Sequence, residues 1–418
     1  MSDIPEDILE GILRHLSSDF PSLKACSLSH SSFLPPTRRL LLSNVKLRHC
    51  RQNSHTDICL EFRETLLASK YMQSFIRTLI LHHWDLIEDI KYQCIFPTLL
   101  ELIPDLRRVH ISLGTNKATI LGANFFPLPH SISSVRHLIL DDIVFETHAQ
   151  MLSLFASFSD LEVISASRIR FDDPGATDHI PVPSYHCTPS TLELNMGGAA
   201  LECLFNSPQS TISIANLRIL SVLLFERNIF AIASVLSLSS SSLEHLTLIP
   251  AEIGAHSARN RVDLREQSCL RRISTSLVFD SQAWTPKNLP KPFPWAHRFF
   301  KTLPASIEDV FIEVGLSPYD AILLPQKQKE WQRLDHILAS HPGDFTIRLG
   351  ISLDYHFCDP DEDDPCYREW PTCSDMEEYF RNFLLVDGMP EMNKLGRLNC
   401  EITRSGLVFS AYMNDSRW

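Results

Sequence analysis

The chain has 418 residues, of which 44% are hydrophobic and 21% are charged, a composition typical of folded soluble proteins. Its formal net charge of −12 argues against a nucleic-acid backbone or an anionic membrane as the main ligand, because either needs a basic footprint. No apolar run approaches the roughly 20 residues that span a bilayer, and the acidic N-terminus lacks the features of a secretory signal, so we expect a cytoplasmic or nuclear protein.

The first 47 residues predict three short helices and a strand. Pro5 stands where the first turn of a helix tolerates proline, and five apolar residues follow at helical spacing, which are Ile8, Leu9, Ile12, Leu13 and Leu16. Asp19 and Ser22 are candidate N-caps for a second helix, and a third lies around residues 38–42. The alternation of 45–47 is typical of a strand. A unit this small buries little core, so it must pack on the rest of the chain or on a partner.

This N-terminal pattern resembles the F-box, the adaptor-binding motif of ubiquitin-ligase substrate receptors, in the form common in fungi. The matching residues are Ile4-Pro5-x-Asp7-Ile8-Leu9, Ile12, Leu16, Cys26-Ser27-Leu28 and Phe33, the last at a position where the family usually has Trp. The resemblance implies a Skp-family adaptor as partner and, through it, a cullin. It also implies an adaptor-binding set made of Ile4, Pro5, Ile8, Leu9, Ile12, Leu16 and Phe33. The alternative is that 5–16 is an amphipathic helix that only caps a larger domain.

The rest of the chain repeats one phrase, Leu-x-x-Leu-x-Leu with apolar substitutes. It occurs at 76–81, 106–111, 135–140, 161–166, 191–194, 217–222, 243–248, 270–275 and 307–312. Successive copies are 26 to 30 residues apart, except for a last interval of 37, and this near-constant period is typical of stacked repeats. Helices are predicted between the copies at 57–71, 92–103, 147–157, 199–205 and 228–238.

Strands that alternate with helices in this way predict an α/β fold of parallel strands with outer helices. The pattern resembles a leucine-rich-repeat solenoid; an ordinary α/β sheet is the alternative. The family usually has Asn or Cys shortly after each strand, whereas this chain has Trp84, Gly114, Ile143, Phe225 and Ala251 at those positions. Without an asparagine ladder, the turns must satisfy their backbone groups by other means.

The period breaks in a proline-rich and aromatic stretch around 280–304, which we interpret as an insertion with a helix at 295–302, or alternatively as a partner-binding loop. Beyond it the sequence predicts a helix at 326–340, a strand at 345–353, a helix at 375–385 and a strand at 406–413. We expect the segment 325–418 to cap the solenoid. The predicted domains are thus an F-box at 1–48 and a solenoid at 49–418.

Few residue groups point to chemistry. The acidic stretch Asp359–Pro365 has oxygen ligands for a hard cation but lacks the spacing of a calcium loop, and a solvated acidic loop is the simpler interpretation. The adjacent His82 and His83 would point to opposite sides, and the 11 cysteines contain no C-x-x-C pair. No phosphate loop, nucleophile elbow or zinc-protease motif is present. We therefore expect no catalytic residues, no metal and no cofactor.

The alternate residues of each strand predict a polar face opposite the core. Its expected members are Arg108, His110, Ser112, His137, Ile139, Asp141, Ser165, Glu193, Asn195, Ser221, Leu223, His245, Thr247, Arg272, Ser274, Asp309, Phe311 and Glu313. By the family resemblance this face binds a target protein. The candidates for that role are Arg108, His110, His137, Asp141, Glu193, His245, Arg272, Phe311 and Glu313.

These expectations combine into a non-catalytic substrate receptor of an SCF-type ubiquitin ligase. Two alternatives remain open at this point. One is an interaction scaffold outside any ligase, whose F-box-like helices only cap the solenoid. The other is a hydrolase or metal enzyme within a degenerate α/β fold.

Overall fold

A parallel β-sheet with connecting helices forms the framework of the protein. The computed structural model describes residues 5–17, 19–48, 58–82, 95–112, 120–121, 132–172, 187–206, 210–225, 228–252, 262–279, 292–316, 327–353 and 373–402. Twelve strands follow one another in the order β1-β2-β3-β5-β7-β9-β10-β11-β12-β13-β14-β15. The predicted α/β class with parallel strands is thereby confirmed. The chain divides into two compact units, Met1–Ser213 and Ile214–Trp418.

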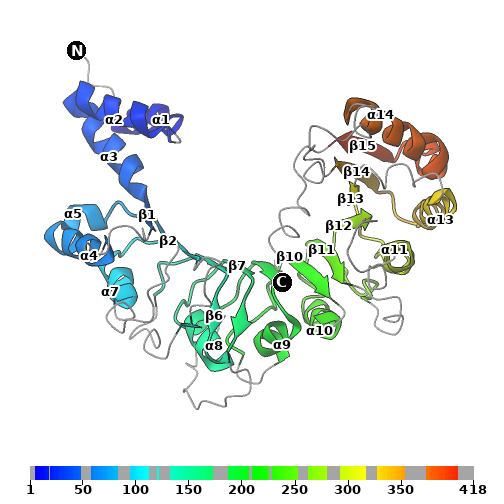
Figure 1. Cartoon of the computed structure of the whole chain (residues 1–418), viewed down its shortest axis with the longest axis horizontal. Helices are drawn as coiled ribbons and strands as arrows, with labels where there is room; N and C mark the ends of the chain where they lie inside the picture. The colour runs from blue at the N-terminus through cyan, green and yellow to red at the C-terminus, as the bar shows by residue number, and fades with distance from the viewer. Residues whose placement is uncertain are drawn as a thin grey trace, which may run out of the picture. The chain divides into compact units, whose positions relative to one another are not determined.

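Unit 1 begins with the three predicted helices, drawn in blue in Figure 1. They are α1 (Glu6–Arg14), α2 (Phe20–Ser29) and α3 (Leu34–Ser43), with a 3₁₀ turn at Ser31–Phe33. Asp19 caps α2 by accepting a hydrogen bond from the Ser22 backbone N–H at 3.1 Å. Leu9, Leu13 and Leu23 are buried and form the small core of this group.

The first strand of the main sheet in unit 1 matches the strand expected at 45–47, and the others overlap the repeated phrase. These strands are β1 (Asn44–Arg48), β2 (Thr78–His82), β3 (Arg108–Ser112), β5 (His137–Asp141), β7 (Val163–Ser167) and β9 (Thr191–Asn195). The helices between them are α4 (Ile58–Ala68), α5 (Lys70–Gln73), α7 (Ile95–Leu102), α8 (His148–Ala156) and α9 (Gly198–Asn206). Leu79, Val109 and Leu138 lie side by side in register and are fully buried, so the phrase marks the core positions.

The turns of unit 1 satisfy their backbone groups from the next repeat. Asp142 and Arg168 adopt positive φ angles of 54° and 53°. In this conformation the Asp142 N–H donates to the Ser167 carbonyl at 3.0 Å, and the Arg168 N–H donates to the Asn195 carbonyl at 2.8 Å. A small second sheet is made of β4 (Ile120–Leu121), β6 (Val144–Phe145) and β8 (Arg170–Phe171), and β6 and β8 each follow one of these turns. Stacked backbone bonds therefore replace the missing asparagine ladder here.

Unit 2 continues the alternation of strand and helix. Its strands are β10 (Ile219–Phe225), β11 (His245–Glu252), β12 (Arg272–Phe279), β13 (Asp309–Leu316), β14 (Thr346–Leu353) and β15 (Leu398–Ile402). Its helices are α10 (Ile229–Leu238), α11 (Pro292–Phe300), α13 (Gln328–Ala339), α14 (Cys373–Phe383), a π-helical turn at Leu384–Gly388 and α15 (Pro390–Lys394).

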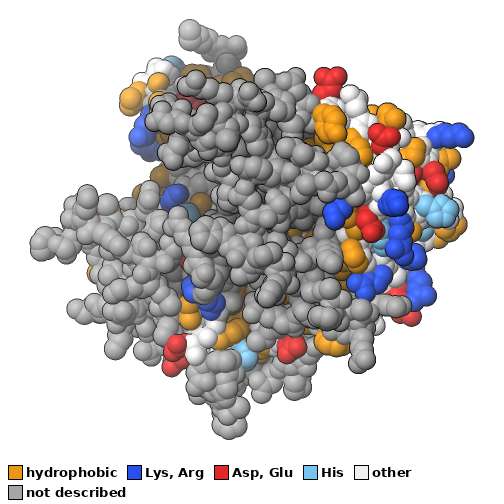
Figure 2. Space-filling model, turned by 45° about the vertical axis from the view of Figure 1, so that its right-hand side comes forward, with side chains coloured by type: hydrophobic (Ala, Val, Ile, Leu, Met, Phe, Trp, Pro, Cys, Tyr) orange, Lys and Arg blue, Asp and Glu red, His pale blue; other side chains and the backbone are white. Residues whose placement is uncertain are grey.

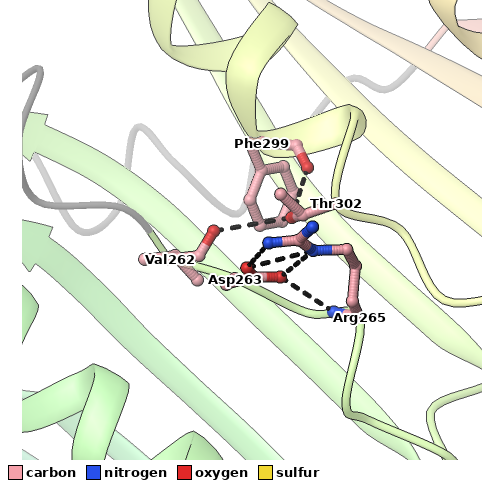
Figure 3. Close-up of polar contacts among 5 residues, drawn as sticks. All are labelled: Val262, Asp263, Arg265, Phe299 and Thr302. Carbon is pink, nitrogen blue, oxygen red and sulfur yellow. Dashed lines mark hydrogen bonds and ion pairs between the residues drawn. The ribbon is translucent and has the colours of Figure 1, made fainter.

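The segment expected as an insertion contains a connecting helix. α11 lies between β12 and β13 in the chain, as the other helices lie between their strands, and it packs on α13. Figure 3 shows how its end is fixed: the Thr302 hydroxyl donates to the Phe299 carbonyl at 2.8 Å and contacts the Val262 carbonyl at 3.5 Å. In the predicted cap, β14 pairs with β13, and β15 pairs with β14. The strand expected at 406–413 lies outside the described residues.

One asparagine of unit 2 does bond the turn backbone. Asn228 is fully buried; its Oδ1 accepts from the Phe225 N–H and its Nδ2 donates to the Leu223 carbonyl, both at 2.8 Å. Asn228→Ala leaves both backbone groups buried without these partners, and we expect it to lower the free energy of unfolding by about 2–3 kcal/mol. Urea unfolding measures this loss. Asn216→Ala, at an exposed turn position, serves as the control, and an equal loss in both variants would contradict the assigned role.

A buried histidine couples the stability of unit 2 to pH. Burial lowers the pKa of His297 below its ordinary value, although its Nε2 can donate to the Glu330 carbonyl at 2.9 Å. Because the folded-state pKa is the lower one, the unfolded chain binds more protons as the pH falls, and stability present above the ordinary pKa is lost on acidification. We expect the urea midpoint to fall between about pH 7 and pH 5, and to fall less in His297→Gln. Identical pH profiles would exclude this histidine as a contributor.

Candidate functional site

Large apolar side chains are exposed on the first two helices, α1 and α2. Ile8 and Ile12 of α1 have exposed fractions of 52% and 56%. They are four residues apart, so they lie one turn from each other on the same side of the helix. On α2, Phe20 is 46% exposed and Leu28 is 87% exposed. Such residues contribute binding free energy only when a partner removes them from water.

The orientation of α1 is fixed by two buried leucines, each of which directly follows one of the exposed isoleucines. Leu9 and Leu13 are 4% and 2% exposed, and they anchor the helix in the three-helix core. At its start, the Pro5 carbonyl accepts from the N–H groups of both Ile8 and Leu9 at 3.1 Å. α1 is therefore held from one side, which leaves Ile8 and Ile12 facing outward.

A charged contact also fastens α1 to α3. Glu10 accepts from Arg14 at 2.8 Å within α1 and forms an ion pair with Arg39 of α3 at 3.5 Å. The hydrogen bond from Arg14, with the nearby charge of Arg39, lowers the pKa of the Glu10 carboxyl. Because these groups are partly exposed, the contacts orient the helix more than they stabilise it.

The expected adaptor-binding residues divide into three groups. Pro5, Ile8 and Ile12 are exposed, whereas Leu16 and Phe33 are half-buried. Leu9 lies in the core, where it anchors α1 and presents no surface to a partner. Ile4 lies outside the described residues.

Two exposed residues were not in the expected set. Phe20 follows the capping residue of α2, and Leu28 lies five positions after the buried Leu23, a spacing that places it off the buried side. That spacing was the available signal for Leu28. For Phe20 the sequence carries no such signal.

The polar face of unit 1 is the second candidate surface. Arg108 and Glu193 are exposed, and His110, His137 and Asp141 are half-buried. Asp141 is not available as an isolated charge, because Arg168 donates to both of its carboxylate oxygens at 2.9 and 2.8 Å and the Ser167 hydroxyl donates to it as well.

The polar face of unit 2 differs from the expectation at one position. Arg272 is exposed, and His245 and Phe311 are half-buried, with the guanidinium of Arg348 5.5 Å from the Phe311 ring centroid. Glu313 has the same strand parity as Phe311 but is only 3% exposed, so it is not part of an accessible surface. Alternation along a strand determines on which side of the sheet a side chain lies, but it does not determine whether that side chain is covered by other parts of the fold.

The described residues contain no set of three or more His, Cys, Asp or Glu side chains placed to hold a metal ion. Burial raises the pKa of Cys187 to about 12 and the pKa values of Cys203 and Cys400 to about 11, so these thiols stay protonated at neutral pH and are poor nucleophiles. The acidic stretch 359–365 and His83 lie outside the described residues. His82 packs edge-on against His110, with ring centroids 5.1 Å apart.

Comparison with protein-family models and with curated proteins found no match to this chain. Within the described part of the structure, no helix is both long and apolar enough to cross a membrane.

Proposed function

We propose that this chain is the substrate-recognition subunit of an SCF-type ubiquitin ligase. The N-terminal helices bind a Skp-family adaptor, which links the chain to a cullin, and the solenoid binds a target protein. The observation that carries the proposal is the exposed pair Ile8 and Ile12 on a helix whose other apolar side chains are already buried. A substrate receptor needs no active site, because the target is modified by enzymes held nearby and proximity supplies the rate. Such a role places the protein in the cytoplasm or the nucleus.

The size of the exposed apolar set is adequate for an interface core. Fully burying an Ile or Phe side chain is worth roughly 1.5–3 kcal/mol, and a few such anchors dominate a typical interface of roughly 1,600 Å². Ile8 and Ile12 supply two anchors on α1, and Phe20 and Leu28 add apolar surface on α2. We expect the remainder of the interface to be a rim of polar residues that complement those of the adaptor.

Co-expression with a Skp-family adaptor tests the proposal. The full chain should purify with the adaptor as an equimolar complex that survives size-exclusion chromatography. If the chain purifies well folded and without adaptor when the adaptor is in excess, the proposal fails.

One observation favours a second function, an interaction scaffold outside any ligase. α3 ends at Ser43 and β1 starts at Asn44, so the three helices lead directly into the first strand, as a structural cap would. In that case the helices protect the edge strand β1, and the solenoid binds its partner without an adaptor. The same co-expression experiment separates the two functions.

A further inference from the structure

Basic side chains, two of them cationic and three of them histidines, gather at one end of the polar face in unit 1. The register places Lys46 of β1 opposite Ile80 of β2, which lies opposite His110 of β3. In the next row, Arg108 lies opposite His137 of β5. We call the set Lys46, His82, Arg108, His110 and His137 the basic face.

The basic face is accessible to a ligand. Lys46 and Arg108 are exposed, and the three histidines are half-buried. The residues between them in the strands, such as Leu47, Val109 and Leu138, are buried on the opposite side and belong to the core. The face thus presents nitrogen groups outward on a rigid parallel sheet.

Among the described residues, the carboxylate nearest to the basic face is already paired. The acid that is nearest in register, Asp141, already accepts hydrogen bonds from Arg168 and Ser167. Burial is the main cause that lowers the pKa of His110; the charge of Asp141 raises this pKa, and the charges of Arg108 and Lys46 lower it. Anionic groups placed there would gain Coulomb attraction in a partly desolvated setting.

The local positive charge of the basic face is opposite in sign to the net charge of the whole chain. The net charge of −12 repels anionic ligands at long range, so any attraction for them must come from a local cluster of cations. Two cations that directly precede neighbouring strands form ion pairs: Arg77 with Asp105 at 3.1 Å, and Arg136 with Glu162 at 2.7 Å. Among the described residues of this edge, Lys46 of β1, Arg108 of β3 and Arg107, just before β3, carry positive charge outside such ion pairs.

We propose that the basic face binds an acidic peptide segment of the target protein. Four strands at about 4.8 Å spacing give a surface roughly 14 Å wide, which an extended segment of about four residues crosses. Carboxylates at alternate positions of that segment would meet Lys46 and Arg108, with the histidines as hydrogen-bond donors. The inference deepens the proposed function by giving the chemistry of its target, and it is tested without the adaptor, so either can fail while the other stands.

Fluorescence anisotropy of the full chain tests this inference. The probe is a fluorescein-labelled twelve-residue peptide of alternating Glu and Ser, with a Lys-Ser peptide of the same length as the control. We expect the Glu-Ser peptide alone to bind, and to lose at least tenfold in affinity between about 50 mM and 500 mM salt. The variant Lys46→Glu/Arg108→Glu should weaken binding by at least about tenfold, and Arg108→Lys should retain most of it.

The matched control makes the same charge change in unit 2. Lys329→Glu/Arg333→Glu alters two exposed cations of α13, where Glu330 lies between them in sequence. On the face drawn in Figure 2, cationic and acidic side chains of the described residues are interspersed in this manner. Equal losses in the two double variants, or no binding of the Glu-Ser peptide, would overturn the inference.

A second experiment tests whether a segment of this chain, and not of a target protein, binds to the basic face. The acidic stretch Asp359–Asp364 could compete for the same cations, so its acids are changed to Asn and Gln. Unchanged affinity for the Glu-Ser peptide supports a segment from a separate protein as the ligand. A tenfold gain would identify the chain's own stretch as the occupant and overturn the inference.

Discussion

Ile8→Asp together with Ile12→Asp is expected to abolish capture of a Skp-family adaptor by the full chain. Both side chains are more than half exposed and lie one turn apart on α1. A carboxylate at each position loses the apolar burial and adds a charge that the interface must desolvate. We expect at least a hundredfold loss of affinity, which corresponds to about 2.7 kcal/mol. Adaptor pull-down with purified full-length chain measures it.

The control for this variant removes the same kind of residue elsewhere. Leu67 of α4 and Phe230 of α10 are 53% and 65% exposed, and Leu67→Asp/Phe230→Asp should capture adaptor as the wild type does. Since the substituted side chains of α1 are largely in water, circular dichroism should show an unchanged fold. Undiminished capture by the α1 variant, or an equal loss in the control, would count against the assignment.

Trp331→Ala is expected to destabilise unit 2 by about 3–5 kcal/mol, the largest stability effect that we anticipate. Trp331 of α13 is fully buried, with its ring centroid 5.0 Å from that of Phe293 on α11 and 6.5 Å from that of Phe380 on α14. It thus joins three helices, and its removal leaves a cavity that rigid neighbours cannot fill.

Urea unfolding followed by circular dichroism measures this loss. Phe230→Ala, an aromatic truncation at a residue that is 65% exposed, should cost less than about 0.5 kcal/mol. At urea concentrations below the unfolding transition, Trp331→Ala should still capture the adaptor, because the proposed adaptor surface lies in unit 1. A change under about 1 kcal/mol would show that the aromatic cluster does not hold these helices.

The repeat was predictable because its phrase encodes burial directly. Positions such as Leu79, Val109 and Leu138 are apolar in the sequence and buried side by side in the sheet, so the period gives both strands and register. The turns were not predictable in the same way. Positive φ angles at Asp142 and Arg168 carry no glycine signal, and Asn228 bonds the turn backbone three residues beyond the expected position at Phe225.

The sequence predicted that the candidate site contains a helix, but it did not predict which residues of that helix are exposed. The spacing of apolar residues in α1 indicates an amphipathic helix, yet it does not tell which residues face the core. Packing on α3 decides that Leu9 and Leu13 are buried while Ile8 and Ile12 remain exposed. For Glu313, strand alternation predicted an accessible acid, but the structure buries this side chain. Local periodicity predicts the side of the sheet on which a residue lies, and it does not predict whether the fold buries that position.

Isothermal titration calorimetry of the purified full chain with a purified Skp-family adaptor tests most directly whether the exposed residues of α1 form a binding surface. We expect saturable equimolar binding with a dissociation constant on the order of 10⁻⁷ M or tighter, and a negative heat-capacity change from apolar burial. The titration of Ile8→Asp/Ile12→Asp should give no binding heat. No binding by the wild-type chain, or equal affinity of the double variant, would contradict the account.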